Sequence, residues 1–121
     1  PTHVGGLRYH GMAPMLSHLV HHGHVEPRAY GQKECLEAGI QFARTEGIMP
    51  APEATHAIKG TVDEALKCKA EGKSKSILFN LCGHGHFDMQ AYMDYFSGDL
   101  AEDSFDAKAF EESLSTIPAV N

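Results

Sequence analysis

The chain has 121 residues and a formal net charge of -6 at pH 7, which limits it to one domain with a modest hydrophobic core. The acidic balance and the absence of any run of lysine or arginine argue against a surface that binds the nucleic-acid backbone, so we expect no nucleic-acid partner. No apolar stretch has the length of a membrane span and no signal peptide is visible, so we expect no membrane partner and a cytoplasmic location. The three cysteines, which indicate reduced thiols rather than a disulfide framework, are Cys35, Cys68 and Cys82.

Glycine and proline residues divide the chain into segments whose apolar residues recur with the period of a helix. The first predicted helix begins at Pro14, and Gly23 ends it. The later ones are predicted over residues 32–46, 53–71 and 89–96. A glycine follows each of these segments, which favours a helix end because glycine readily adopts positive φ.

Short apolar segments between the helices predict strands. Residues 77–81 form an apolar run that is typical of a strand buried on both faces, and residues 48–49 form a much shorter one. Residues 25–30 are a possible edge strand, since they contain Pro27. If the first two segments are parallel strands, the helix between them is their right-handed crossover, and their carboxyl ends lie at one edge of a sheet.

That edge carries the most informative side chains. Glu53 follows one strand and Cys82 the other, so the parallel arrangement would bring them together. Each also has a simpler interpretation: Glu53 as an acid favoured in the first turn of a helix, and Cys82 as a small buried apolar residue. Arg8, in a glycine-containing loop, could anchor an anion or simply be exposed.

The acidic tail, residues 99–121, is predicted to be a separate segment after a main unit of residues 1–98. It carries six acidic residues against the single Lys108. Ser104 could cap a helix there that contains Phe105, Phe110 and Leu114. Because the chain begins on a glycine-rich motif without a structured lead-in, we expect it to be part of a longer chain.

The nine histidines suggest a metal site as an alternative. His18, His21 and His22 have the i, i+3 and i+4 spacing of one helical face, His24 lies just beyond, and His84 and His86 flank a glycine. No matching pattern of acids or cysteines accompanies them, which favours surface histidines. A stand-alone, helix-rich interaction or metal-binding module remains the alternative function.

Three motifs carry a family resemblance. Residues 5–14 read Gly-Gly-Leu-Arg-Tyr-His-Gly-Met-Ala-Pro, residues 45–58 read Thr-Glu-Gly-Ile-Met-Pro-Ala-Pro-Glu-Ala-Thr-His-Ala-Ile, and residues 79–85 read Phe-Asn-Leu-Cys-Gly-His-Gly. In this order they resemble the C-terminal part of a tryptophan synthase beta chain, and most closely the second branch of that family. The match runs from Gly5 to about Tyr95.

The resemblance implies an α/β fold: the helix-rich C-terminal portion of a type II fold enzyme that uses pyridoxal phosphate, with two or three short parallel strands. The implied reaction joins L-serine and indole into L-tryptophan and water. Glu53 matches a glutamate beside the cofactor ring, and Cys82 takes the position, usually serine, that faces the pyridine nitrogen. A neutral thiol can replace a hydroxyl there. Gly83 and Gly85 match the Gly-x-Gly of the family.

Other residues match the substrate side of the family site. His84 stands where the common branch has arginine, and Arg8 where it has aspartate. Tyr9 and Gly11 fall in the loop whose backbone oxygens can hold a monovalent cation. The resemblance also implies a Schiff-base lysine and a phosphate-binding loop upstream of this segment. We therefore expect the segment to be inactive alone, to need an upstream half or a complementary chain as partner, and to self-associate as a homo-oligomer.

Overall fold

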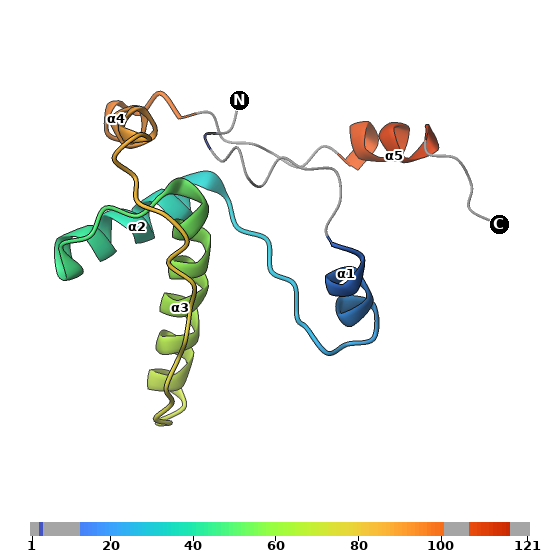
Figure 1. The fold of residues 1–121 in the computed structure, drawn as a ribbon, viewed down its shortest axis with the longest axis horizontal. Coiled ribbons are helices and arrows are strands. Elements are labelled where there is room, and N and C mark those ends of the chain that lie inside the picture. The colour runs from blue at the N-terminus through green and yellow to red at the C-terminus, as the bar shows by residue number, and fades with distance from the viewer. Residues whose placement is uncertain (1–2, 4–12, 101–106, 117–121) are drawn as a thin grey trace.

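The structure is a computed structural model that describes residues 3, 13–100 and 107–116, and five helices lie within this part. They are α1 (Pro14–His21), α2 (Gln32–Glu46), α3 (Pro52–Ala70), α4 (Met89–Ser97) and α5 (Ala107–Ser115) (Figure 1). The helix-rich character predicted from the sequence is confirmed, and the predicted bounds of the first four helices differ from these by at most two residues. Ser104 and Phe105, proposed for a tail helix, lie outside the described residues.

Local signals explain where these helices begin and end. The Glu34 carboxylate accepts a hydrogen bond from the Gly31 N–H at 2.7 Å, which satisfies a free donor at the start of α2. Pro52 occupies the first turn of α3, where its missing N–H costs nothing. Gly47 and Gly98 follow α2 and α4 with φ of 71° and 80°, a conformation that glycine adopts without strain.

The hydrophobic core forms where α2 packs against α3 and α4. Its central cluster combines Leu36 and Ile40 of α2 with Ala91 and Tyr92 of α4. The Tyr92 hydroxyl donates a buried hydrogen bond of 2.6 Å to the carbonyl oxygen of Pro50. Burial, and then the nearby Asp88, raise the pKa of this hydroxyl to about 12. The hydroxyl therefore stays protonated and ties α4 to the segment before α3.

Replacing Tyr92 with phenylalanine is expected to destabilise the chain by about 1–3 kcal/mol, because the buried Pro50 carbonyl then loses its donor. Urea unfolding followed by circular dichroism measures this loss. Tyr95→Phe is the matched control, since Tyr95 is only partly buried at the edge of the same core. A Tyr92→Phe midpoint as high as that of the control would contradict the proposed importance of this hydrogen bond.

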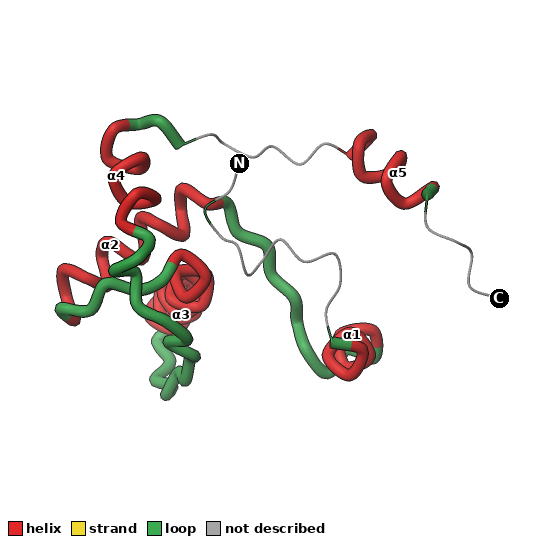
Figure 2. The backbone as a smooth tube through the Cα atoms, turned by 45° about the horizontal axis from the view of Figure 1, so that its top comes forward, coloured by secondary structure: helices red, strands yellow, loops and turns green. Residues whose placement is uncertain are grey.

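The predicted strands do not form in the described part of the chain, which contains only an isolated bridge. The prediction that residues 77–81 are buried on both faces is wrong here, since Leu78 is 97% exposed. These residues instead run back along α3 (Figures 1 and 2), and the Phe79 ring meets Phe42 of α2 at 5.8 Å. Only the face of this segment that carries Ile77 and Phe79 is partly covered. Among the described residues, no neighbouring strand covers the face that carries Leu78.

The backbone around Pro50 and His84 forms that bridge, and it is antiparallel. The Ala51 N–H donates to the Gly83 carbonyl at 2.9 Å, and the Gly85 N–H donates to the Met49 carbonyl at 2.8 Å. The predicted contact between the segments before and after α3 therefore exists, but the predicted parallel pairing is not the one formed. The segment that pairs with residues 49–51 is the glycine turn of residues 83–85, not the apolar run of residues 77–81 that precedes it.

α1 stands apart from the body formed by α2, α3 and α4 (Figure 2). Residues 24–31 lead from α1 to α2 without forming the predicted edge strand. Their last residues are held against α3, where Lys59 lies 5.5 Å above the Tyr30 ring and the Arg28 guanidinium lies 3.7 Å from Glu64. Among the described residues, no helix is long and apolar enough to cross a membrane.

Candidate functional site

The candidate site lies where the glycine turn of residues 82–85 meets the start of α3. The two hydrogen bonds of the antiparallel bridge hold Gly83 and Gly85 against residues 49–51. Glu53 is in the first turn of α3, and Cys82 directly precedes the bridged Gly83. The structure thus brings the segments of both predicted residues together, although through an antiparallel contact.

Glycine is required at position 85 for steric reasons. A Cβ atom there would lie 2.4 Å from the Pro50 carbonyl oxygen and 3.1 Å from Cγ of Met49. At position 83 a Cβ atom would lie 3.3 Å from that of Ala51, a tight but less severe approach. Glycine therefore lets the turn pack directly on the backbone before α3.

The side chains at this turn are accessible. Cys82 is exposed, so its interpretation as a small buried apolar residue is wrong, while Cys35 and Cys68 are buried. Burial, and then the charge of Glu34, raise the pKa of the Cys35 thiol to about 12. Glu53 is half-buried. A carboxylate in this position is also favoured by the positive end of the helix dipole.

His84 is exposed on the same turn, and its ring contacts those of His86 and Phe87 in tilted orientations. Its ring centroid lies 5.0 Å from that of His86 and 5.4 Å from that of Phe87. The His86 N–H donates to Nδ1 of His84 at 3.3 Å, so in the neutral ring the proton is assigned to Nε2. His84 can therefore present an Nε2–H donor to a ligand beside the turn.

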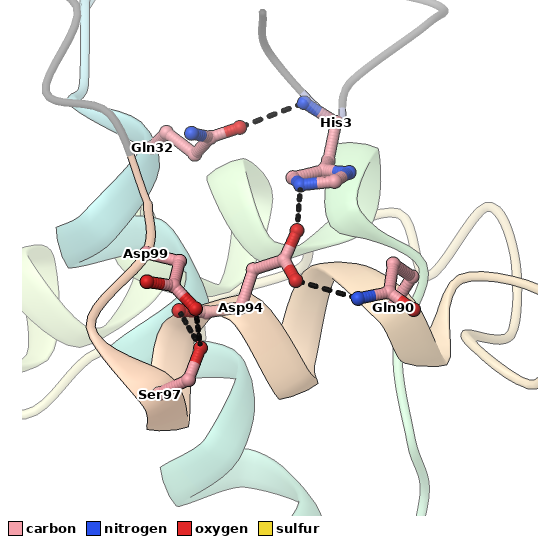
Figure 3. A network of polar contacts seen from close by, with 6 residues as sticks. All are labelled: His3, Gln32, Gln90, Asp94, Ser97 and Asp99. Atoms are coloured by element: carbon pink, nitrogen blue, oxygen red, sulfur yellow. Dashed lines mark hydrogen bonds and ion pairs between the residues drawn. The ribbon is translucent and has the colours of Figure 1, made fainter.

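The remaining predicted residues, Arg8, Tyr9 and Gly11, lie outside the described residues. The chain just before them is fixed at His3, in a network that the sequence did not reveal (Figure 3). The His3 N–H donates to Oε1 of Gln32 at 2.7 Å, and its Nε2 lies 2.8 Å from the Asp94 carboxylate. Gln32 and Asp94 lie 29 and 91 residues after His3 in the chain, so no local sequence pattern predicts these contacts.

The side chains of Gln90 and Gln32 also belong to this network. The Gln90 side chain donates to the other oxygen of Asp94 at 2.6 Å and so orients the carboxylate toward His3. Among the described residues, Nε2 of the buried Gln32 has no hydrogen-bond partner. The network joins His3 to α2 and α4.

The histidines of α1 are exposed and cluster at its end. The rings of His18 and His22 have centroids 4.2 Å apart, and those of His21 and His22 lie 5.2 Å apart. In the described residues, no group of three or more histidine, cysteine, aspartate or glutamate side chains is arranged to hold a metal ion. The structure thus shows a histidine pair with one further ring beside it.

The chain is similar in sequence to proteins that are named tryptophan synthase beta chain. The chain is 60% identical over 98 residues to the tryptophan synthase beta chain 2 of Methanosarcina mazei, covering 81% of this chain and 22% of that protein. It is 57% identical over 102 residues to the tryptophan synthase beta chain 2 of Aquifex aeolicus, covering 84% and 24%. For the tryptophan synthase beta chain of Thermococcus gammatolerans the identity is 58% over 102 residues, covering 84% and 23%.

No family model matches the sequence. The chain spans about a quarter of the length of the curated relatives that it matches. Identities above one half across more than four fifths of the chain confirm the resemblance drawn from the three motifs. By sequence, the chain is therefore homologous to a segment of the tryptophan synthase beta chains.

Proposed function

We propose that the chain is the C-terminal portion of a tryptophan synthase beta-like enzyme of the type II fold, and that it forms the wall facing the pyridine ring of pyridoxal phosphate. The complete enzyme would join L-serine and indole into L-tryptophan and water. The observation that carries the proposal is the bridge that seats residues 82–85 on the start of α3. This contact puts an exposed thiol and the first-turn carboxylate of Glu53 on adjoining segments.

These residues fit the cofactor ring. Cys82 is exposed, so its Sγ can form a neutral hydrogen bond with a ring nitrogen. The glycines beside it let the turn pack closely on residues 49–51, which fixes the place of Cys82 near the start of α3. Pyridoxal phosphate supplies an electron sink when bound, and a neutral partner at its nitrogen moderates that sink. Glu53 would lie beside the ring. Arg8 and His84 would face the amino-acid substrate.

Other parts of the site must come from elsewhere in the longer chain. The seven lysines (Lys33, Lys59, Lys67, Lys69, Lys73, Lys75 and Lys108) stand outside any motif typical of a Schiff-base lysine. The chain likewise has no glycine-rich loop of the kind that binds a phosphate. The partner in our proposal is thus the upstream half of the same chain or a complementary chain. The backbone oxygens of Tyr9 and Gly11 would hold a monovalent cation.

The accessibility of Cys82 provides a direct test. In the full-length protein without cofactor, iodoacetamide is expected to alkylate Cys82 rapidly and to leave Cys35 and Cys68 unmodified, because these two are buried. Adding pyridoxal phosphate should slow alkylation of Cys82 at least tenfold, since the ring would cover its sulfur. Mass spectrometry of the modified peptides measures both rates.

Two comparisons make this test decisive. A Cys82→Ser variant should show no rapid alkylation, which assigns the fast rate to this sulfur. Pyridoxal, which carries the same ring without the phosphate, should protect only at much higher concentration. Equal alkylation rates with and without bound pyridoxal phosphate would contradict the placement of Cys82 at the cofactor ring.

Exposed apolar side chains support the proposed partners. Leu78 is 97% exposed and Phe87 is 93% exposed, both in the segment that follows α3. Isolated residues of this kind are normal, but several of them in a segment that has no neighbouring strand among the described residues favour association. We propose that the upstream half covers this surface in the longer chain, and that a second copy covers it when the segment is alone.

The isolated chain is accordingly expected to be a dimer or larger, with Leu78 at the contact. Light scattering across a hundredfold dilution series measures the mass. Leu78→Lys should shift the chain toward the monomer of 13.2 kDa, while the exposed Leu66→Lys, on the outer part of α3, should not. A monomeric mass for the unmodified chain at all concentrations, with cooperative thermal unfolding, would contradict this proposal.

A further inference from the structure

The histidines at the end of α1 have no role in the proposed function, yet the rings of His18, His21 and His22 lie close together. The rings of His18 and His22 lie closest, with centroids 4.2 Å apart. Their i, i+4 spacing stacks both side chains on one face of the helix. The helix itself has no buried residue, so solvent reaches these rings from outside.

This pair is suited to a cation that prefers nitrogen ligands. Imidazole nitrogens bind a divalent transition metal at about 2.0–2.1 Å, and two residues one helical turn apart can both reach one ion. The rings are exposed, so rotation about their side-chain bonds can turn both nitrogens toward a common point at little cost. The sequence spacing allowed such a site, and the structure adds that these two rings are already in contact.

The end of the helix also favours positive charge. His18 and His21 lie in the last turn of α1 and His22 caps it, next to the negative end of the helix dipole. The helix contains no lysine or arginine that would repel a cation. The His24 N–H bonds to the Leu19 carbonyl at 2.9 Å, and Gly23 has a φ of 74°, so the chain folds back tightly at this point.

We propose that His18 and His22 form a two-imidazole site for a borderline transition-metal ion, with copper(II) bound most tightly and water completing its coordination. Imidazole suits copper, nickel and zinc, and the general order of affinity places copper(II) first. Because the described residues place no third protein ligand beside this pair, the ion is held weakly and exchanges with solvent. The site shares no ligand with the proposed pyridoxal-phosphate site.

The test uses the tag-free chain titrated with copper(II) chloride at pH 7.5. One ion per chain should bind, and electron paramagnetic resonance should show two coordinating nitrogens. His18→Ala and His22→Ala should each lower the affinity about 10–100-fold. Circular dichroism should show a gain in helix on binding, because a helix of eight residues is marginal alone and the ion would link two of its turns.

Two controls separate this site from others. His86→Ala should leave the affinity and the helix gain unchanged, although His84 and His86 form a second close pair. Magnesium chloride, which prefers the carboxylates of the tail, should not compete. Copper affinity that is unchanged in the His18→Ala, His22→Ala double variant, or lost in His86→Ala, would overturn the proposal. Binding without a helix gain would also overturn it.

Discussion

Alanine at position 39 is expected to lower the free energy of unfolding by about 1–3 kcal/mol, whereas alanine at position 60 should raise it by about 0.5–1 kcal/mol. Both glycines lie inside helices, so the intrinsic helix preference favours alanine at each. At position 39, however, the Cβ would lie 2.5 Å from Cγ2 of Thr55 and 3.2 Å from the Tyr92 hydroxyl oxygen. Thr55 is fully buried and cannot move aside freely.

Position 60 is a matched control because its Cβ has room. The nearest atoms would belong to the Tyr30 ring, at 3.6 Å and 3.7 Å, which are ordinary contact distances. Urea unfolding at one fixed protein concentration compares the two variants, since association changes apparent stability. If both substitutions shifted the urea midpoint in the same direction, the close approach of α2 to α3 would not determine which side chain is tolerated at position 39.

The isolated chain is expected to make no tryptophan from L-serine and indole, while the full-length protein that contains it should be active with pyridoxal phosphate. The reason is that the segment supplies one wall of the proposed site, without the lysine and the phosphate-binding loop. The expected difference is on the order of 10⁶-fold or more, which reduces the rate to that of the uncatalysed reaction. The change in ultraviolet absorbance when free indole is converted to tryptophan measures turnover.

Borohydride trapping separates lack of binding from lack of turnover. The isolated chain should give no stoichiometric adduct with pyridoxal phosphate at a single lysine, and circular dichroism of the same sample shows whether the chain is folded. Adding a separately produced upstream part should restore turnover if the two parts reassemble. One defined lysine adduct on the isolated chain, or turnover by it, would contradict the proposal.

The helices could be predicted from the sequence because their signals are local. The segment 32–46 is predicted to end before Gly47, and the structure places the helix at the same residues, with the cap contact from Glu34. Helical hydrogen bonds join residues four apart, so the pattern that predicts the helix lies within it. This holds equally for α3, which begins at Pro52.

The strand prediction over residues 77–81 failed because a strand depends on partners that the apolar run itself does not specify. The run Ile77–Leu81 reads the same whether neighbouring strands are present or absent, and in the described part of the chain none lies beside it. The meeting of the segments before and after α3 was predicted correctly, yet the direction of their pairing was not. The contact of His3 with Asp94 was not predictable at all, since the two residues are 91 positions apart.

The bridge between residues 49–51 and 83–85 also determines how the candidate site opens. Its two hydrogen bonds close a loop that contains all of α3, and closing a long loop costs chain entropy that local helix contacts do not. The bridge should therefore form late in folding and open first in the native state. In hydrogen exchange, the amides of Ala51 and Gly85 should exchange sooner than those at the centre of α3, so the site loosens while its helices remain intact.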